Sequence, residues 1–242
     1  MGASKKCLVV SSYDLRRNTS SNIRTVALIQ ALAKKGYTIH CFFISANKEV
    51  DENLDLALKD SCARMIIYKE VQVQSSEAMV EQRKSNALCR IKGYIRTGLI
   101  KMFSVMSVYD IYRTQFYSLN KRDLDKLDND YEMIISSSEP RSSHLLAKKI
   151  CKICKLSMPW VQYWGDPMTN DVASEKLLRV LERREEHRLL RQAQMALYTN
   201  PIVVEYMQKK YSDCGEKINW IPTTDISSGE IKGESVQAAE YD

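Results

Sequence analysis

Glycine is scarce in this chain, and its absence from the first loop is informative. There are 8 glycines in 242 residues, and none lies between Gly2 and Gly36. Dinucleotide-binding enzymes place G-x-G-x-x-G after their first strand, so that the backbone can approach a pyrophosphate. Neither G-x-x-x-x-G-K-[ST] nor G-x-S-x-G occurs elsewhere. The sequence therefore predicts no nicotinamide or flavin dinucleotide on the first loop, no P-loop and no nucleophile elbow.

Long apolar runs are also missing. The N-terminus, MGASKKCLVV, has charge followed by a very short apolar run, which does not suit a secretory signal peptide. A myristoylation signal needs Ser or Thr at position 6, where this chain has Lys6. We therefore expect a cytoplasmic chain, and its hydrophobic share of 44% is typical of a soluble globular protein.

The cysteines form no recognisable framework. There are 7, an odd and scattered set, and several lie in apolar runs such as IHCFFI, which favours reduced and mostly buried thiols. Cys151 and Cys154 have the spacing of a metal-binding pair, but no second pair and no His at ligand spacing accompanies them. We predict no metal site.

Apolar strand-like runs alternate with amphipathic stretches along the chain, and this order is typical of a parallel sheet with helices on both faces. The strands are expected at 6–12, 37–44, 65–71, 131–138, 159–164, 195–200 and 218–222. A first helix, capped by Ser20 or Ser21, should end at Lys35-Gly36. We predict an α/β, Rossmann-like lobe over 1–222 and a polar, mobile tail over 223–242.

Polar loops follow three of these strands, and the carboxyl ends of parallel strands are where ligands bind. The candidate substrate-binding residues there are Ser12, Arg16, Arg17, Ser138, Glu139 and Arg141. The two arginines and a helix start suit an anion, or form a solvated basic loop. The Ser136–Arg141 stretch either caps a helix or also contacts a ligand.

Four blocks of sequence resemble the N-terminal lobe of family 4 glycosyltransferases, which have the two-lobed B-type fold. The blocks occur in the family's order over residues 6–222. They read KCLVVSSYDLRRNTSSNIRTVALIQALAKKGYTIHCFFI, YEMIISSSEPRSSHLLAKKICKICKLSMPWVQYWGDPMTND, QMALYTNPIVVEYMQKKY and KINWIP. In that family this lobe binds the acceptor, and a C-terminal lobe binds a nucleotide sugar whose glycosyl group is usually transferred with retention.

The resemblance implies roles for three further residues. Trp164-Gly165-Asp166-Pro167-Met168 corresponds to the family's WxxDPW-like loop, which places Asp166 at the interlobe site as a catalytic residue. Trp164 would stack on a sugar ring, and Asn200 would contact substrate. Read from the residues alone, Asp166 has the alternative role of capping the turn that follows it.

The chain also departs from the family pattern. It has Arg16–Ser20 where the family has a glycine-rich loop, and Thr223-Thr224 where the family often has Asn-Gly. Only a short tail follows Asp225, so we expect that this chain alone holds no nucleotide sugar and completes no transfer. A complementing C-terminal lobe is the implied partner. The alternatives are a non-catalytic binding module and a fragment of a longer transferase.

Residues 83–113 form a basic, amphipathic segment whose net charge equals the formal charge of the whole chain, +6. Its apolar stripe with Arg90, Arg96 and Lys101 alongside suits peripheral contact with an anionic membrane surface, or a helix packed on the sheet with a solvated face. The acceptor implied by the resemblance is lipid-linked or a polysaccharide. No nucleic-acid-binding motif occurs, so we expect no nucleic-acid partner.

Overall fold

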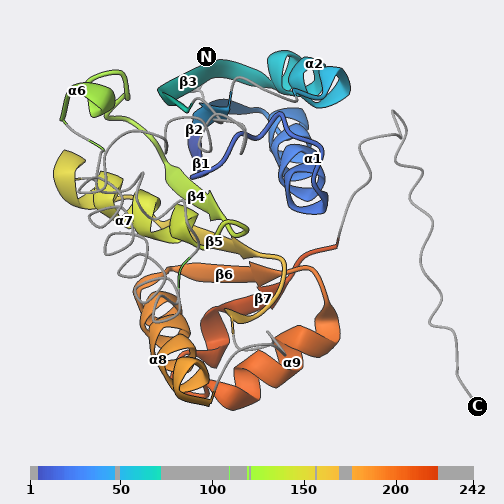
Figure 1. The fold of residues 1–242 in the computed structure, drawn as a ribbon, viewed down its shortest axis with the longest axis vertical. Coiled ribbons are helices and arrows are strands. Elements are labelled where there is room, and N and C mark those ends of the chain that lie inside the picture. The colour runs from blue at the N-terminus through green and yellow to red at the C-terminus, as the bar shows by residue number, and fades with distance from the viewer. Residues whose placement is uncertain are drawn as a thin grey trace, which may run out of the picture.

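The chain folds into a seven-stranded sheet in which every pair of neighbouring strands is parallel (Figure 1). A computed structural model describes residues 5–46, 50–71, 109, 119, 121–155, 157–168 and 176–222. The strands are β1 (Lys5–Val10), β2 (Tyr37–Ala46), β3 (Cys62–Val71), β4 (Met133–Ser137), β5 (Trp160–Trp164), β6 (Met195–Tyr198) and β7 (Ile218–Trp220). Their order in the sheet is β3-β2-β1-β4-β5-β6-β7. The predicted Rossmann-like parallel sheet is confirmed.

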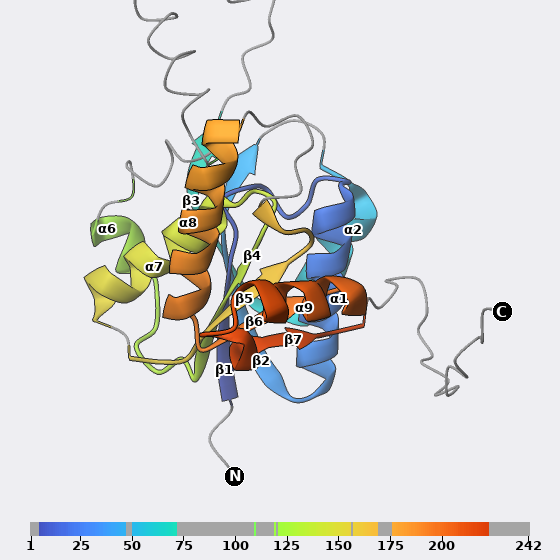
Figure 2. The same ribbon diagram turned by 90° about the horizontal axis from the view of Figure 1, so that it is seen from below.

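Helices cover both faces of this sheet, because the chain moves outward from β1 in one direction and then from β4 in the other. The helices are α1 (Ser20–Lys34), α2 (Glu52–Ser61), α6 (Lys121–Leu124), α7 (Ser142–Cys154), α8 (Lys176–Gln192) and α9 (Pro201–Lys210), with a short turn η3 (Gly215–Lys217). Figure 2 shows α1 and α2 on one side of the sheet and α7 and α8 on the other. Right-handed crossovers in both directions produce this arrangement.

The ends of α1 follow directly from its sequence. Thr19, and neither Ser20 nor Ser21 as predicted, is the N-cap, and its side chain accepts a hydrogen bond from the Asn22 amide. Ser21 instead points at the sheet and donates to a carbonyl of the strand-end loop after β4. Gly36, at φ 87°, ends the helix as predicted, because a residue without a β-carbon adopts this angle at little cost.

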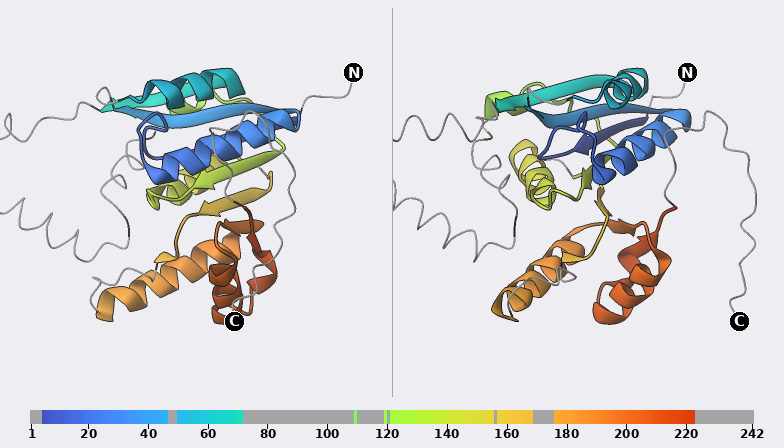
Figure 3. Two further views of the ribbon diagram at one scale, coloured as in Figure 1. Left: turned by 90° about the vertical axis from the view of Figure 1, so that its right-hand side faces the viewer. Right: turned by 45° about the vertical axis from the view of Figure 1, so that its right-hand side comes forward.

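Two apolar cores lie on the two faces of the sheet. One joins alternate residues of β1, β2 and β4 to α1 and α2, and includes Val26, Ile29 and Leu58. The other joins the sheet to α7, α8 and α9, and includes Leu146 and Leu189. Figure 3 shows α8 and α9 together at the β6–β7 end of the sheet, away from α1 and α2.

The basic segment expected to contact a membrane, with Arg90, Arg96 and Lys101, lies outside the described residues, as does the tail over 223–242. None of the helices in the described ranges is long and apolar enough to cross a membrane.

His144 is a fully buried histidine within the second core. Its Nδ1 lies 2.7 Å from Oγ of Ser136, and its ring packs against Trp164 at 4.2 Å between centroids. Its Nε2 has no hydrogen-bond partner within the described part of the chain. Burial lowers the pKa of His144 from 6.5 to about 3. The side chain is therefore neutral at physiological pH and packs in the core.

This burial predicts a specific acid sensitivity. Because the folded pKa lies below the unfolded one, the unfolded chain takes up the proton first, and stability is lost as pH falls from about 6.5 towards 3. His144→Asn keeps a polar group near Ser136 but removes the titration. We expect it to cost about 2 kcal/mol at pH 7.5, and to lower the dependence of unfolding free energy on pH by about 1.4 kcal/mol per pH unit below pH 6. Urea unfolding from pH 7.5 to 4.5 measures both, and equal slopes in the two proteins would contradict the assignment.

Candidate functional site

The candidate site lies where β1 and β4 are neighbours in the middle of the sheet. The helix after β1 leaves to one face and the helix after β4 leaves to the other, so the two strand-end loops part at this point. In open α/β sheets this topological switch point is the usual place for a ligand. The structure brings the predicted loops after β1, β4 and β5 to the same edge of the sheet, because these strands are parallel neighbours.

Beneath these loops, buried hydroxyl groups form a seam of hydrogen bonds between the strand ends and the helices. Oγ of Ser12 lies 2.6 Å from Oγ of Ser142 and 3.2 Å from Oγ of Ser143. On the other face, Oγ1 of Thr25 lies 2.6 Å from Oγ of Ser137. Ser12, a predicted substrate-binding residue, is 1% exposed. Its side chain therefore joins the loop after β1 to α7, and in this arrangement it does not face solvent.

The first loop is held by a buried carboxylate where dinucleotide-binding proteins have glycine. Asp14 is 1% exposed and accepts from Nε and Nη2 of Arg16, each at 2.9 Å. Nη2 of Arg16 also donates to Ser45 at 2.7 Å, and Arg17 lies over the ring of Tyr13. Both arginines thus contact their own loop or β2, and no geometry here brings them to Asp166.

The loop after β4 turns sharply at Glu139. This residue is exposed and has a φ of 62°, in the left-handed region that non-glycine residues adopt at a cost. The backbone before it is fixed, because Oγ of Ser138 accepts from the Gly165 amide at 3.1 Å and Oγ of Ser21 donates to the Ser138 carbonyl at 2.9 Å. The Glu139-Pro140 peptide bond is cis. Glu139 is thereby presented at the surface beside the β5 loop.

The three serines of this stretch do not cap α7, which corrects one interpretation of the sequence. Ser136 and Ser137 belong to β4, and the N-cap of α7 is Arg141, which makes no capping hydrogen bond. The Arg141 side chain instead reaches across to the β5 loop, where it donates to the carbonyl of Met168 at 3.1 Å and lies 3.4 Å from the Glu182 carboxylate.

The Asp166 loop is anchored from below by α8. Met168 is buried, and its amide donates to Oε1 of Glu186 at 2.6 Å. Glu186 is itself fully buried, and its other oxygen accepts from Lys210 at 3.0 Å and from the Tyr211 hydroxyl at 2.7 Å. Asp166, two residues before Met168, is exposed. Among the described residues no side chain or backbone group bonds its carboxylate, so the alternative role of turn cap lacks its hydrogen bond.

Arg24 is a site residue that the sequence did not single out. A β-carbon built on Gly165 would lie 2.6 Å from Nη2 of Arg24 and 3.9 Å from Oε1 of Glu139. Glycine is therefore needed at 165 for close approach, and its φ is not in the positive range. Arg24 lies in the second turn of α1. Its position near the start of the helix after β1 is the one feature of the sequence that could have marked it as a site residue.

Trp164 has a different role from the one expected. It is fully buried, its indole NH donates to Gln162 at 3.0 Å, and its ring lies between His144 and Tyr198. No ring face is open to a sugar, so stacking on a substrate is excluded in this arrangement. The aromatic residue instead fixes the end of β5, from which Gly165 and Asp166 emerge.

Asn200, predicted to contact substrate, is the N-cap of α9. It is exposed at the end of β6, and its side chain accepts from the Ile202 amide at 2.9 Å. The helix start is sufficient to account for an asparagine at this position. The structure does bring Arg24 and Glu139 beside Gly165, and Asp166 is the next residue of that loop.

No protein-family model matches this chain, and no curated protein matches it by sequence. Several solved structures are similar. A crystal structure of Anabaena Alr3699/HepE in complex with UDP and glucose aligns at 8% identity and a TM-score of 0.47, over 90% of this chain and 44% of that one. Glycyrrhiza uralensis UGT73P12, complexed with glycyrrhetinic acid 3-O-monoglucuronide, aligns at 13% identity and a TM-score of 0.40, over 89% and 48%. This chain spans less than half of each, and the likeness concerns the fold alone.

The buried Glu186 carboxylate predicts a large effect on stability. Glu186→Ala removes the buried carboxylate that pairs with the Lys210 ammonium, whose side chain is 9% exposed. We expect the unfolding free energy to fall by about 3 kcal/mol, the usual cost of breaking a buried ion pair from one side. Glu186→Leu combined with Lys210→Met should recover much of this loss. Denaturant unfolding of the single and double variants checks this, and additive losses would contradict it.

At Glu139, by contrast, the backbone predicts that a substitution raises the unfolding free energy. Glu139→Gly should raise the unfolding free energy by about 1 kcal/mol, because glycine adopts the left-handed region without strain. Lys155, at φ 53° after α7 and exposed, offers a matched control, and Lys155→Gly should stabilise by a similar amount. Thermal unfolding of both variants tests this. A loss of stability in Glu139→Gly alone would show that the carboxylate itself stabilises the fold.

Proposed function

We propose that this chain is the acceptor-binding lobe of a nucleotide-sugar-dependent glycosyltransferase, with Asp166 orienting a sugar hydroxyl. The observation that carries the proposal is the group of charged side chains at the switch point. Arg24 of α1 and Glu139 of the β4 loop lie beside Gly165, and Asp166 is the next residue of the β5 loop. Among the described residues, none of these three side chains makes a hydrogen bond or ion pair. Carboxylates and a guanidinium with unused hydrogen-bonding capacity suit the hydroxyl groups of a saccharide.

The chemistry expected of each residue follows from its position. The anchored Met168 and the bond from Gly165 to Ser138 limit the motion of Asp166, so less entropy is lost when a hydroxyl binds to it. Glu139 supplies a second carboxylate and Arg24 a donor. We propose that transfer proceeds with retention, on a lipid-linked or polysaccharide acceptor, and that the nucleotide sugar is held by a second lobe.

Exposed apolar groups near the same edge support a second lobe as partner. Ile202, in the first turn of α9 after β6, is 76% exposed, and Trp220, the last residue of β7, is 53% exposed. Trp220 is tied to this place because its indole NH donates to the Thr199 carbonyl at 3.3 Å. A second lobe packed on this edge would remove both apolar side chains from water.

Saccharide binding by the purified chain tests the site. UDP and glucose are the first probes, because the Anabaena protein was crystallised with both. In ligand-observed NMR we expect weak binding of glucose or of a wider saccharide panel, with little binding of UDP. Asp166→Asn should reduce the saccharide signal severalfold. Asp60→Asn, an exposed aspartate at the end of α2, is the control and should leave the signal unchanged.

Two outcomes would overturn the proposal. A saccharide signal that survives Asp166→Asn would remove the role of Asp166. Binding of UDP without any saccharide would assign the chain to the donor side. As a further check, incubation with UDP-glucose and a membrane extract should give no transfer, since a second lobe is needed, and robust turnover by the purified chain would contradict this.

A further inference from the structure

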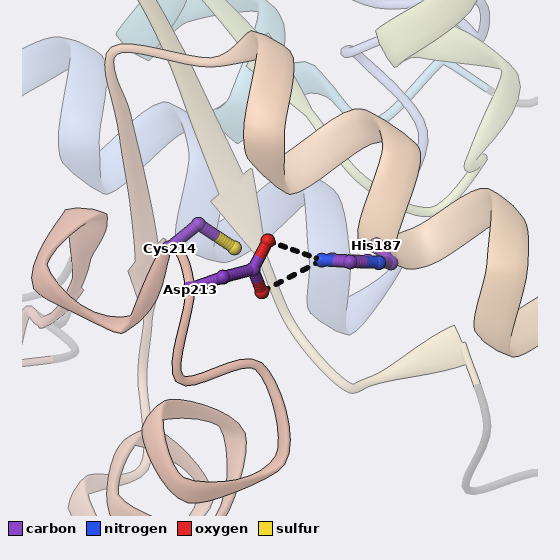
Figure 4. Close-up of side chains that lie close together, drawn as sticks. All are labelled: His187, Asp213 and Cys214. Carbon is purple, nitrogen blue, oxygen red and sulfur yellow. Dashed lines mark hydrogen bonds and ion pairs between the residues drawn. The ribbon is translucent and has the colours of Figure 1, made fainter.

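A histidine, a carboxylate and a thiol meet at the opposite end of the sheet from the candidate site. His187 lies in α8, towards its C-terminal end, and Asp213 and Cys214 lie in the turn between α9 and η3. Nε2 of His187 is 2.8 and 2.9 Å from the two carboxylate oxygens of Asp213. Figure 4 shows the Asp213 carboxylate between the ring of His187 and the sulfur of Cys214. One ligand atom from each residue lies within 4.8 Å of the others.

The fold holds these three side chains in place. The ring of His187 stacks on Tyr211 at 5.1 Å between centroids and an angle of 11°. The Tyr211 hydroxyl is in turn fixed by Glu186 of α8, at 2.7 Å. Cys214 is 2% exposed, and its amide donates to the Tyr211 carbonyl at 3.0 Å. The cluster therefore joins α8 to the turn after α9 at defined positions, and this preorganisation favours binding of an ion.

Two of the cations near the cluster bind other groups. Nζ of Lys217 donates to the carbonyls of Arg191 and Ala193 at 2.9 and 3.1 Å, and Arg188 pairs with Glu185. Nε of Arg191 lies 3.7 Å from Asp213 and is the cation that faces the cluster most directly. A surface cavity of about 430 Å³ opens at the His187 side of the cluster and is lined by Arg184, His187, Arg188, Arg191 and Gln192.

We propose that Nε2 of His187, a carboxylate oxygen of Asp213 and Sγ of Cys214 bind one zinc ion, with water as the fourth ligand. Nitrogen, oxygen and sulfur donors together suit zinc, whereas calcium and magnesium take oxygen donors. Ligand atoms around tetrahedral zinc lie about 3.5 Å apart, so small side-chain movements convert the present contacts into coordination. The Cys214 thiol loses its proton on binding, and the Nε2 proton of His187 is replaced by the metal.

Sequence spacing could not reveal this site. His187 is 26 residues from Asp213, and the thiol follows the carboxylate directly, which matches no metal-binding motif. The expectation that the chain has no metal site considered Cys151 and Cys154 alone. The proposed site is independent of the saccharide site, and its consequence is to fasten α8 to the turn that leads into β7.

Titration of the full, tag-free chain with zinc chloride tests the proposal. Calorimetry should show one zinc ion per chain, and addition of zinc should raise the melting temperature because the folded state binds it preferentially. With cobalt(II) in place of zinc, a thiolate-to-metal charge-transfer band should appear. Cys214→Ser should abolish the band, and His187→Asn and Asp213→Asn should each weaken zinc binding by at least roughly tenfold.

A matched control separates this cluster from the other cysteine pair. Cys151→Ser combined with Cys154→Ser should leave the stoichiometry, the affinity and the cobalt band unchanged. Asp213 is exposed, so Asp213→Asn does not depend on repacking of the core, and circular dichroism confirms its folding. The proposal is overturned if zinc does not bind at one per chain, if Cys214→Ser keeps the cobalt band, or if only the Cys151 and Cys154 substitutions remove binding.

Discussion

The pairing of β1 with β4 is the contact on which the rest of this fold depends. The chain builds outward from it in both directions, so helices leave to opposite faces and the loops above the pair separate. Because two helices must approach the same two strand ends, the residues between them are small and hydroxyl-bearing, as with Ser12 against Ser142 and Thr25 against Ser137. A larger side chain at any of these positions would push a helix away, and an apolar one would leave its partner hydroxyl buried without a bond.

The first loop, beside these hydroxyl groups, is ordered without glycines. Glycine in that loop lets a phosphate approach the backbone, whereas here the buried Asp14 carboxylate gathers Arg16 and the Arg16 backbone amide, and the Asn22 amide binds the Asp14 carbonyl. The loop is thus fixed by side chains and occupies its own space. The side chains that make no hydrogen bond or ion pair among the described residues lie at the β4 and β5 loops instead: Glu139, Asp166 and, reaching Gly165 from α1, Arg24.

The sequence predicted what depends on local pattern and missed what depends on contact at long range. Apolar runs bounded by polar loops located every strand of the sheet, and Gly36 located the end of α1. The burial of Trp164 was not predictable, because a tryptophan at the end of a strand can either stack on a ligand or pack in the core. Only the contacts of its ring with His144 and Tyr198 show that it is a core residue. Arg24 and Glu186 were missed because their contacts lie 18 or more residues away in sequence, where periodicity carries no information.

Glu186 shows how the two ends of the β5–α8–α9 unit are coupled. One of its oxygens holds the Met168 amide below Asp166, and the other holds Lys210 and Tyr211, on which the His187 ring rests. A carboxylate with four lone-pair sites accepts all of these bonds at once, and a neutral amide in its place would both lose acceptors and remove the negative charge that faces the buried Lys210 ammonium. The buried Glu186 carboxylate therefore fixes the Asp166 loop near the start of α8. The same charge also holds α8 against the end of α9.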